Sequence, residues 1–231
     1  MTYKMPTYHK IQTLFKRHQS GKNKGKMIKG DWTTPELEYL AGNEWEFTEK
    51  VDGTNIRIGY YHSYHGYPRV AFAGRSDNAV IPNPLMEHLE ATFTPELFNN
   101  ADLPECVLFG EGYGPKIQNG GNYRSDVSFV LFDVYVDGWW LKRKDVDDVA
   151  EKLNIDSVPV IGYGTLQDAI DIVETGITFN KGGGIEKWGN GGLQSQWGNF
   201  EAEGIVARPK VHLTDRSGSR IITKIKAVDF K

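Results

Sequence analysis

Short apolar runs separated by polar residues and glycines recur along most of the chain, a pattern typical of strands that pack on a core. Several runs are rich in β-branched and aromatic residues and therefore predict strands. They are Trp45–Phe47, Ile56–Tyr61, Arg69–Ala73, Val107–Gly110, Val127–Val136, Gly204–Ala207 and Arg220–Ile225. Val127–Val136 is almost continuously apolar, so we expect a strand covered on both faces.

Helical spacing of apolar residues is less frequent. Pro84–Phe93 shows it after Asn83, which we expect to be the N-cap. Asp145–Leu153 and Leu166–Val173 have the same periodicity, the second after Thr165 as a cap. Strands outnumber helices and do not strictly alternate with them. The predicted fold class is therefore α+β, with mostly antiparallel sheets and flanking helices.

Composition limits the class of protein. A chain of 231 residues fits one large domain over residues 1–231, and 39% hydrophobic with 25% charged residues is ordinary for a soluble globular protein. The net charge of -3 argues against coating of nucleic acid by bulk charge, but leaves room for a local basic patch. Cys106 is the only cysteine, so no intrachain disulfide or Cys-based zinc site is expected. No apolar run approaches a membrane helix, and we expect a cytoplasmic protein with no membrane partner.

Two segments are loop-like. Lys16–Lys29 contains six cations and no acidic residue, and we expect a solvated loop, with contact to a phosphate backbone as the alternative. Gly182–Asn199 is rich in Gly and Asn. Its residues Trp188 and Trp197 either cap the core or stack on unpaired bases.

Charged residues gather at the ends of the expected strands. Lys50 ends one strand beside Glu49 and leads into the turn Asp52-Gly53, while Glu111 follows a second strand and Glu203 precedes a third. A lysine attacks phosphorus only as a neutral amine, a form that neighbouring cations and partial burial favour. Carboxylates such as these also suit a hard cation or ribose hydroxyls.

Two further lysines lie together near the end of the chain. Lys224 and Lys226 flank Ile225, so on a strand both side chains point to the same face. With a bound metal they would supply a cationic field and hold a triphosphate. The alternative is that they form the polar face of an edge strand.

The order of these pieces resembles the covalent nucleotidyltransferase superfamily, which comprises DNA ligases, RNA ligases and mRNA capping enzymes. Lys50-Val51-Asp52-Gly53 matches its nucleophile motif Lys-x-Asp-Gly. Five further elements follow in the superfamily's order: Gly74-Arg75-Ser76, Phe109-Gly110-Glu111, Phe129–Asp133, Glu203–Pro209 and Lys224-Ile225-Lys226. One Lys-x-Asp-Gly is a weak signal, but six elements in order are a strong one.

Two details resemble the RNA ligase 2 branch: Thr54-Asn55 after Gly53, and Gly114-Pro115-Lys116-Ile117-Gln118 after Glu111. The resemblance implies the fold of a nucleotidyltransferase (ATP-grasp-like ligase adenylation) domain. It also implies the function of an ATP-dependent RNA ligase, with ATP and Mg²⁺ as cofactors and Mn²⁺ as a possible replacement for Mg²⁺. RNA ends would be its partners. The open alternatives are a minimal ligase of DNA or mixed duplex nicks, a capping-type nucleotidyltransferase, and a non-catalytic protein that binds nucleic-acid ends.

The resemblance also implies roles for single residues. Lys50 would attack the α-phosphorus of ATP, and Asn55 would hold metal-bound water nearby, unless it only satisfies the turn backbone. Glu111 and Glu203 would serve the ribose and the metal. The remaining nucleotide contacts would be Glu49 to the adenine amine, Phe129 (rather than Phe132) stacked on the base, Arg75 to phosphate or ribose unless it is a structural ion pair, and Lys224 and Lys226 to the phosphates.

The chain ends five residues after Lys226. We therefore expect no OB domain, and none of the appended C-terminal domains common in RNA ligases. A partner protein replacing such a domain is one expectation that follows.

Overall fold

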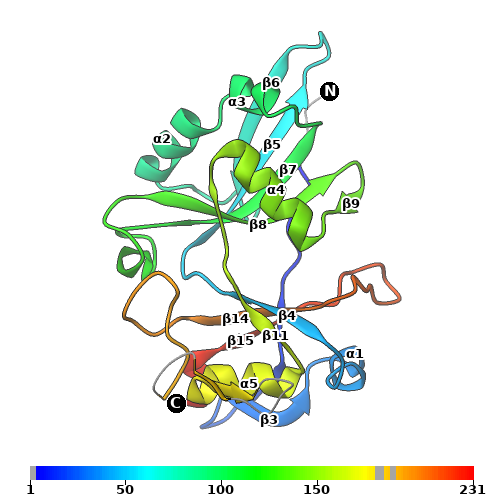
Figure 1. Cartoon of the computed structure of the whole chain (residues 1–231), viewed down its shortest axis with the longest axis vertical. Coiled ribbons are helices and arrows are strands. Elements are labelled where there is room, and N and C mark those ends of the chain that lie inside the picture. Colours follow the sequence, from blue (N-terminus) through cyan, green and yellow to red (C-terminus); the bar gives the residue numbers. More distant parts are fainter. Residues whose placement is uncertain (1–3, 180–184, 188–190) are drawn as a thin grey trace. The chain divides into compact units, whose positions relative to one another are not determined.

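The computed structural model describes residues 4–179, 185–187 and 191–231. The chain forms two compact units, each built from two segments that can be followed by colour in Figure 1. Unit 1 comprises Met1–Tyr8 and Val51–Val158, and unit 2 comprises His9–Lys50 and Pro159–Lys231. The predicted single adenylation domain over residues 1–231 would contain both units, and it stays a prediction.

Unit 1 is built on a six-stranded sheet in the order β10-β8-β7-β5-β6, with β9 paired to β8. All pairs are antiparallel except β10 with β8. The strands are β5 (Thr54–His62), β6 (Pro68–Gly74), β7 (Cys106–Tyr113), β8 (Ser128–Val136), β9 (Trp139–Trp140) and β10 (Asp156–Ser157).

Three helices lie on one face of this sheet: α2 (Asn83–Thr92), α3 (Pro95–Asn100) and α4 (Arg143–Leu153) (Figure 1). Their apolar residues, including Leu85, Phe98 and Val146, form one core with Ile56 and Ile58 of β5. The prediction that Asn83 caps α2 is wrong. Pro82 is the N-cap, and Asn83 is already the first residue of the helix. Pro84 is tolerated in the first turn because the backbone N–H groups there have no partner within the helix, so the N–H that proline lacks is not missed.

The opposite face of the sheet is covered by residues 4–8. The Tyr8 hydroxyl donates to the buried Asp133 carboxylate, and the fully buried Arg57 donates to the carbonyls of Gly74, Met5 and Pro6. The Tyr8 ring packs within 5.1–5.6 Å of the rings of Phe109, Phe132 and Trp140. The predicted covering of β8 on both faces is therefore confirmed.

Unit 2 is built on a five-stranded sheet in the order β1-β15-β14-β4-β11. The α5 helix (Leu166–Thr175) packs on one face against Trp45, Phe47, Ile205 and Ile225. The predicted cap is confirmed, because Thr165 and Asp168 form a capping box at the start of α5. The strands are β1 (Gln12–Thr13), β4 (Trp45–Glu49), β11 (Val160–Gly164), β14 (Gly204–Pro209) and β15 (Thr223–Lys226).

Smaller elements complete unit 2. The prediction of a loop over Lys16–Lys29 is wrong at both ends, since β2 (Phe15–Arg17) and β3 (Met27–Trp32) form an antiparallel hairpin. The buried Phe15 ring lies 4.9 Å from the Trp32 ring and anchors this hairpin to the core. The others are α1 (Pro35–Tyr39), β12 (Ile177–Phe179), β13 (Ile185–Lys187) and a 3₁₀ helix at Ala227–Phe230; unit 1 has a 3₁₀ helix at Gly120–Asn122.

The segment Gly182–Asn199 is only partly described. Its residues Ile185–Lys187 form β13 rather than loop, and Trp197 is half-buried. Trp188 lies outside the described residues, so its expected role stays a prediction.

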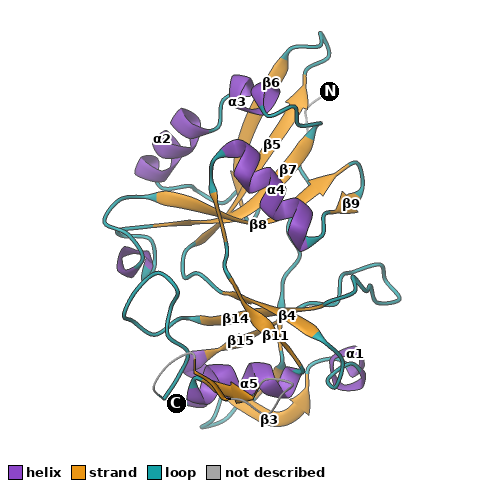
Figure 2. Ribbon diagram, viewed as in Figure 1, coloured by secondary structure: helices purple, strands orange, loops and turns teal. Residues whose placement is uncertain are grey.

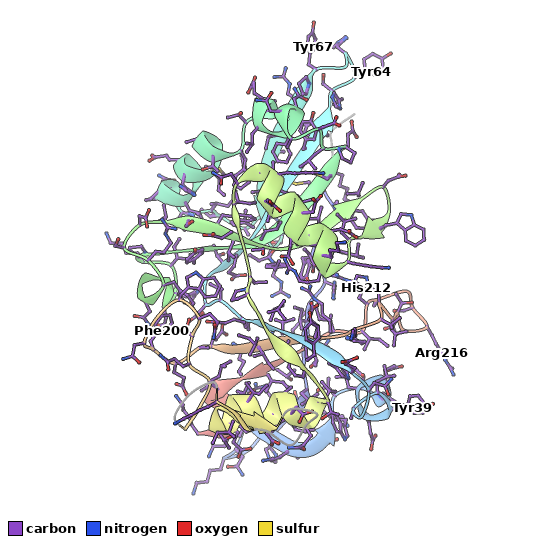
Figure 3. The ribbon with its side chains drawn as sticks, viewed as in Figure 1. Tyr39, Tyr64, Tyr67, Phe200, His212 and Arg216 are labelled. Atoms are coloured by element: carbon purple, nitrogen blue, oxygen red, sulfur yellow. The ribbon has the colours of Figure 1, made fainter. Side chains whose placement is uncertain are left out.

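Over the part of the chain that the structure describes, fifteen strands and five α-helices are present, and Figure 2 shows this dominance of strands. The predicted α+β class with mostly antiparallel sheets is confirmed. Tyr64 and Tyr67, two large exposed side chains in the turn between β5 and β6, point outward in Figure 3. None of the described helices is long and apolar enough to cross a membrane.

Candidate nucleotide-binding and catalytic residues

In unit 2, strand register brings three distant charged residues together. Ile205 of β14 pairs with Glu49 of β4, and Gly204 pairs with Lys226 of β15. The Lys50 amide donates to the Gly204 carbonyl at 2.9 Å, which continues the β4–β14 pairing to the lysine. The end of β4, the start of β14 and the end of β15 therefore meet at Lys50, Glu203 and Lys226.

The Glu203 carboxylate forms ion pairs with two ammonium groups. One oxygen binds Lys50 Nζ, and the other lies 2.5 Å from Lys226 Nζ. The three side chains are 15–30% exposed, so they remain accessible to a ligand. Lys224 lies on the same face of β15 as Lys226, because side chains alternate along a strand and the alternate residues Thr223 and Ile225 point to the buried face. The prediction that both lysines share a face is confirmed.

Glu49 lies on the face of this sheet opposite to Lys224 and Lys226, beside its buried cross-strand partner Ile205. It is 1% exposed, and its carboxylate accepts hydrogen bonds from Ser195 Oγ at 2.6 Å and from the Gln196 amide at 2.7 Å. Burial raises the pKa of Glu49, although these two donors oppose the change. Each oxygen keeps a second lone pair, so recognition of an adenine amine stays a prediction.

In unit 1, three candidate residues lie toward one end of the sheet. Asn55 of β5 is the cross-strand partner of Glu111 of β7, so these two side chains share a face. Arg75 is exposed and directly follows Gly74, the partner of Ile56 on β6. Asn55 Oδ1 is buried and finds no hydrogen-bond donor among the described residues, an arrangement that calls for a donor from water or a ligand.

Phe129 does not join Asn55 and Glu111. It pairs with Gly112, whereas Val130 pairs with Glu111, so Phe129 lies on the helix-covered face. The ring is 3% exposed and packs edge-to-face on Phe93 at 5.3 Å. Stacking of Phe129 on a base stays a prediction, and one that this burial does not favour.

Two glycines next to candidate residues are required by packing. A Cβ on Gly53 would lie 2.3 Å from the Gly112 carbonyl oxygen, and a Cβ on Gly110 would lie 2.1 Å from Phe129 Cζ. The turn after Lys50 and the strand before Glu111 therefore approach their neighbours more closely than any side chain would permit.

Comparison with known proteins identifies the family to which this chain belongs. A family model described as RNA ligase matches residues 43–226, which is more than half of the chain. The chain belongs to the RNA ligase family. No curated protein matches it significantly in sequence.

Solved RNA ligases from Naegleria gruberi share this family fold. A variant solved with ATP and Mn aligns with a TM-score of 0.60 and 15% identity, covering 98% of this chain and 64% of the other. An apo variant gives 0.58 and 18%, covering 83% and 52%. A complex with PPi gives 0.55 and 17%, covering 95% and 61%. The chain thus spans between about half and two thirds of the length of these proteins.

Several contacts in this RNA ligase family chain were not identified from sequence. Ser195 and Gln196 hold Glu49, and they come from a Gly- and Asn-rich segment with no motif to mark them. Asn119 donates to the Asp52 carboxylate at 2.6 Å, and the Asp52 amide donates to Tyr123 Oη at 3.2 Å. These contacts fasten the Lys50–Gly53 turn to the segment after β7, and only the folded chain reveals them.

Metal binding in this RNA ligase family chain has only a few candidate ligands. Across residues 4–179, 185–187 and 191–231, no three His, Cys, Asp or Glu side chains converge as a metal site. Mg²⁺ is commonly held by one or two carboxylates together with substrate phosphates, so Glu111 and Glu203 remain suitable for it.

Proposed function

We propose that this RNA ligase family chain captures AMP from ATP on Lys50 and uses it to join 5′-phosphate and 3′-hydroxyl ends of RNA. The observation that carries the proposal is the Glu203 carboxylate, which binds both Lys50 and Lys226 within a chain that the family matches over residues 43–226. A reactive lysine is thereby oriented by an acid and flanked by further cations.

Three displacements at phosphorus account for the activity. Lys50 Nζ, having lost a proton, attacks the α-phosphorus, the bond to the β-phosphate oxygen breaks, and pyrophosphate leaves. An oxygen of the RNA 5′-phosphate then attacks the same phosphorus and releases the lysine. Finally the 3′-hydroxyl, losing its proton, attacks the 5′-phosphate phosphorus, expels AMP and closes the phosphodiester bond.

The residues of unit 2 act mainly through charge. Lys224 and Lys226 bind the phosphates and stabilise the negative charge that builds on phosphoryl oxygens. Glu203 orients the Lys50 amine, and uptake of a cation by this carboxylate would compete with the ion pair and release the amine for attack.

A divalent cation, Mg²⁺ or Mn²⁺, would neutralise phosphate charge when bound. Glu111 and Glu203 would hold it, and Asn55 would bind its water shell. The buried Asn55 Oδ1, which lacks a donor among the described residues and lies beside Glu111, fits that role. A Naegleria gruberi RNA ligase variant solved with ATP and Mn supports ATP and a divalent cation as what this chain binds.

The remaining contacts concern the nucleotide and the ends that are joined. Glu49 would read the adenine amine, and Arg75 would contact phosphate or ribose. Glu111 would also bind the ribose. DNA or mixed duplex ends, and a partner protein, are further candidates that a sealing assay with each type of end would distinguish.

The test is the intact mass of the protein after incubation with ATP and Mg²⁺. We expect wild type to gain the mass of one AMP and Lys50→Ala to gain none. Lys210→Ala serves as the control, because Lys210 is also a unit 2 lysine paired with a glutamate, Glu44, and should label like wild type. An unlabelled wild type, or a labelled Lys50→Ala, would contradict the proposal. GTP in place of ATP tests the capping-type alternative.

A further inference from the structure

An open groove of about 830 Å³ lies within unit 2 and is lined by β1, the β2–β3 hairpin and β15. Its basic lining residues are Lys10, Lys16, Arg17, His18, Lys224 and Lys226. Asp31 is the one acid among the described lining residues. The groove therefore begins at the two lysines proposed to bind the ATP phosphates and continues along the hairpin.

The positive charge of this region is not neutralised by its neighbours. Three acids pair with hairpin residues: Asp31 with Lys16 at 2.7 Å, Asp229 with Arg17 at 2.6 Å, and Glu174 with Lys29 at 2.9 Å. The hairpin and the segment before it carry seven cations, namely Lys10, Lys16, Arg17, Lys22, Lys24, Lys26 and Lys29. Because the whole chain has a net charge of -3, this excess is a local feature of the fold.

The cationic tip of the hairpin is held by its own backbone. The His18 amide donates to the Lys26 carbonyl at 3.0 Å, and the Gly25 amide donates to the His18 carbonyl at 2.8 Å. Gly21 and Gly25 adopt positive φ in the turn that joins β2 to β3. Lys22 and Lys24 are exposed on this turn, which directly follows the groove residues Arg17, His18 and Gln19 along the chain.

The other groove residues determine what kind of ligand fits. Gln12, Thr13, Gln19 and Thr33 offer amides and hydroxyls, which are common partners of phosphate and sugar oxygens. Phe, Tyr and Trp are absent from the described lining residues, so no ring is available to stack on a base. Such a surface contacts a nucleic-acid backbone without reading its sequence.

We infer that this groove binds the phosphate backbone of a single RNA strand whose end is joined at Lys50. The inference rests on the proposed function only for what happens at that end. Backbone contact is measurable by itself, because each phosphate neutralised by a lysine releases counterions and makes binding depend on salt.

The experiment compares two variants that each remove three exposed lysines. The groove variant is Lys10→Ala and Lys16→Ala in the lining, combined with Lys24→Ala on the adjoining hairpin turn. The control is Lys142→Ala with Lys144→Ala and Lys152→Ala, in or next to α4 of unit 1. The affinity of each for a short 5′-phosphorylated single-stranded RNA is measured by fluorescence anisotropy between about 50 and 200 mM salt. AMP capture from ATP is measured in parallel by intact mass.

We expect the groove variant to bind RNA about tenfold more weakly than wild type. The plot of log affinity against log salt should become less steep by about 2, because each lysine that contacts a phosphate contributes roughly 0.7 to the slope. The control should bind like wild type, and both variants should capture AMP. Replacing the same three lysines by Arg should keep the salt slope, which shows whether the effect of the Ala variant comes from lost charge or from disturbed folding.

The opposite results are equally clear. Equal affinities and slopes in groove and control variants would overturn the inference. Loss of AMP capture with RNA binding retained would also overturn it, and would assign the groove to the triphosphate of ATP. If wild type captures no AMP, the proposed function fails, while the salt slopes still decide whether the groove binds RNA.

Discussion

Glu49 ends β4 and Glu203 directly precedes the neighbouring strand β14, but the two carboxylates have different environments. Glu203 is accessible and binds two lysines, so its carboxylate can exchange these partners for a ligand. Glu49 is 1% exposed and is held by Ser195 and Gln196, so it has a fixed orientation. At the scale of single residues, the hydrogen-bond and ion-pair partners therefore leave Glu203 able to bind a ligand and hold Glu49 in one orientation.

Ser195→Ala tests the second case. Removing the hydroxyl leaves the buried Glu49 carboxylate with one donor fewer and leaves the Trp197 amide without its acceptor, so we expect a loss of about 1–3 kcal/mol in the free energy of unfolding. Urea denaturation measures it. Ser157→Ala is the control, because Ser157 also donates to a carboxylate, Asp147, at the surface, and should change stability by less than about 0.5 kcal/mol. Equal effects of both substitutions would refute this account of Glu49.

Strand pairs are the elements that assemble the candidate residues. β5 and β7 bring Asn55 opposite Glu111, and β4, β14 and β15 bring Lys50, Glu203 and Lys226 together. These registers depend on close approach, which explains why glycines adjoin the charged residues. The Phe129 ring and the Val130 carbonyl oxygen leave no room for a Cβ at Gly110.

Gly110→Ala is therefore expected to destabilise the protein by about 1–3 kcal/mol, because backbone as well as a ring must move. Gly42→Ala provides the comparison, since a Cβ there meets no atom within 4 Å and the residue has no positive φ. It should be neutral or stabilise by up to about 1 kcal/mol. Thermal and urea unfolding of the two variants decide the matter, and a harmless Gly110→Ala would show that β7 is not packed as described.

At the scale of the whole molecule, each of the two units has its own apolar core. The core of unit 1 contains the single cysteine, Cys106, which pairs with Tyr60 across β7 and β5. Burial raises the pKa of the Cys106 thiol from 9.0 to about 12. Between these two pKa values the thiol therefore stays protonated in the folded protein but is largely deprotonated in the unfolded chain.

The sign of the pH dependence follows. Above about pH 9 the folded state binds more protons than the unfolded state, so the stability of wild type should fall with rising pH by up to about 1.4 kcal/mol per pH unit. Because tyrosines titrate in the same range, the comparison is with Cys106→Ala, which should lack this part of the decline. Urea midpoints between about pH 8 and about pH 10 measure it. Parallel curves for both proteins would contradict the burial of this thiol.

The strands with continuous apolar or β-branched sequence were predicted from it within a few residues of their observed ends. Ile56–Tyr61 became β5, and Val127–Val136 became β8. The edge strand β11 was missed, because Gly162 and Gly164 weaken its local preference and pairing with β4 stabilises it. The β2–β3 hairpin was missed for a similar reason, since its cations gain Asp229 and Glu174 as partners only in the folded chain.

The sequence by itself determined the fold class, the family and the order of the charged residues from Glu49 to Lys226, because apolar periodicity and motif order are local properties of the chain. Only the tertiary structure decided which of these residues meet. Cross-strand register joined Glu203 to two lysines and Asn55 to Glu111, and it turned Phe129 into the core of unit 1. The physical reason is that a side chain's face and partners depend on strand pairing between distant segments, which no local pattern records.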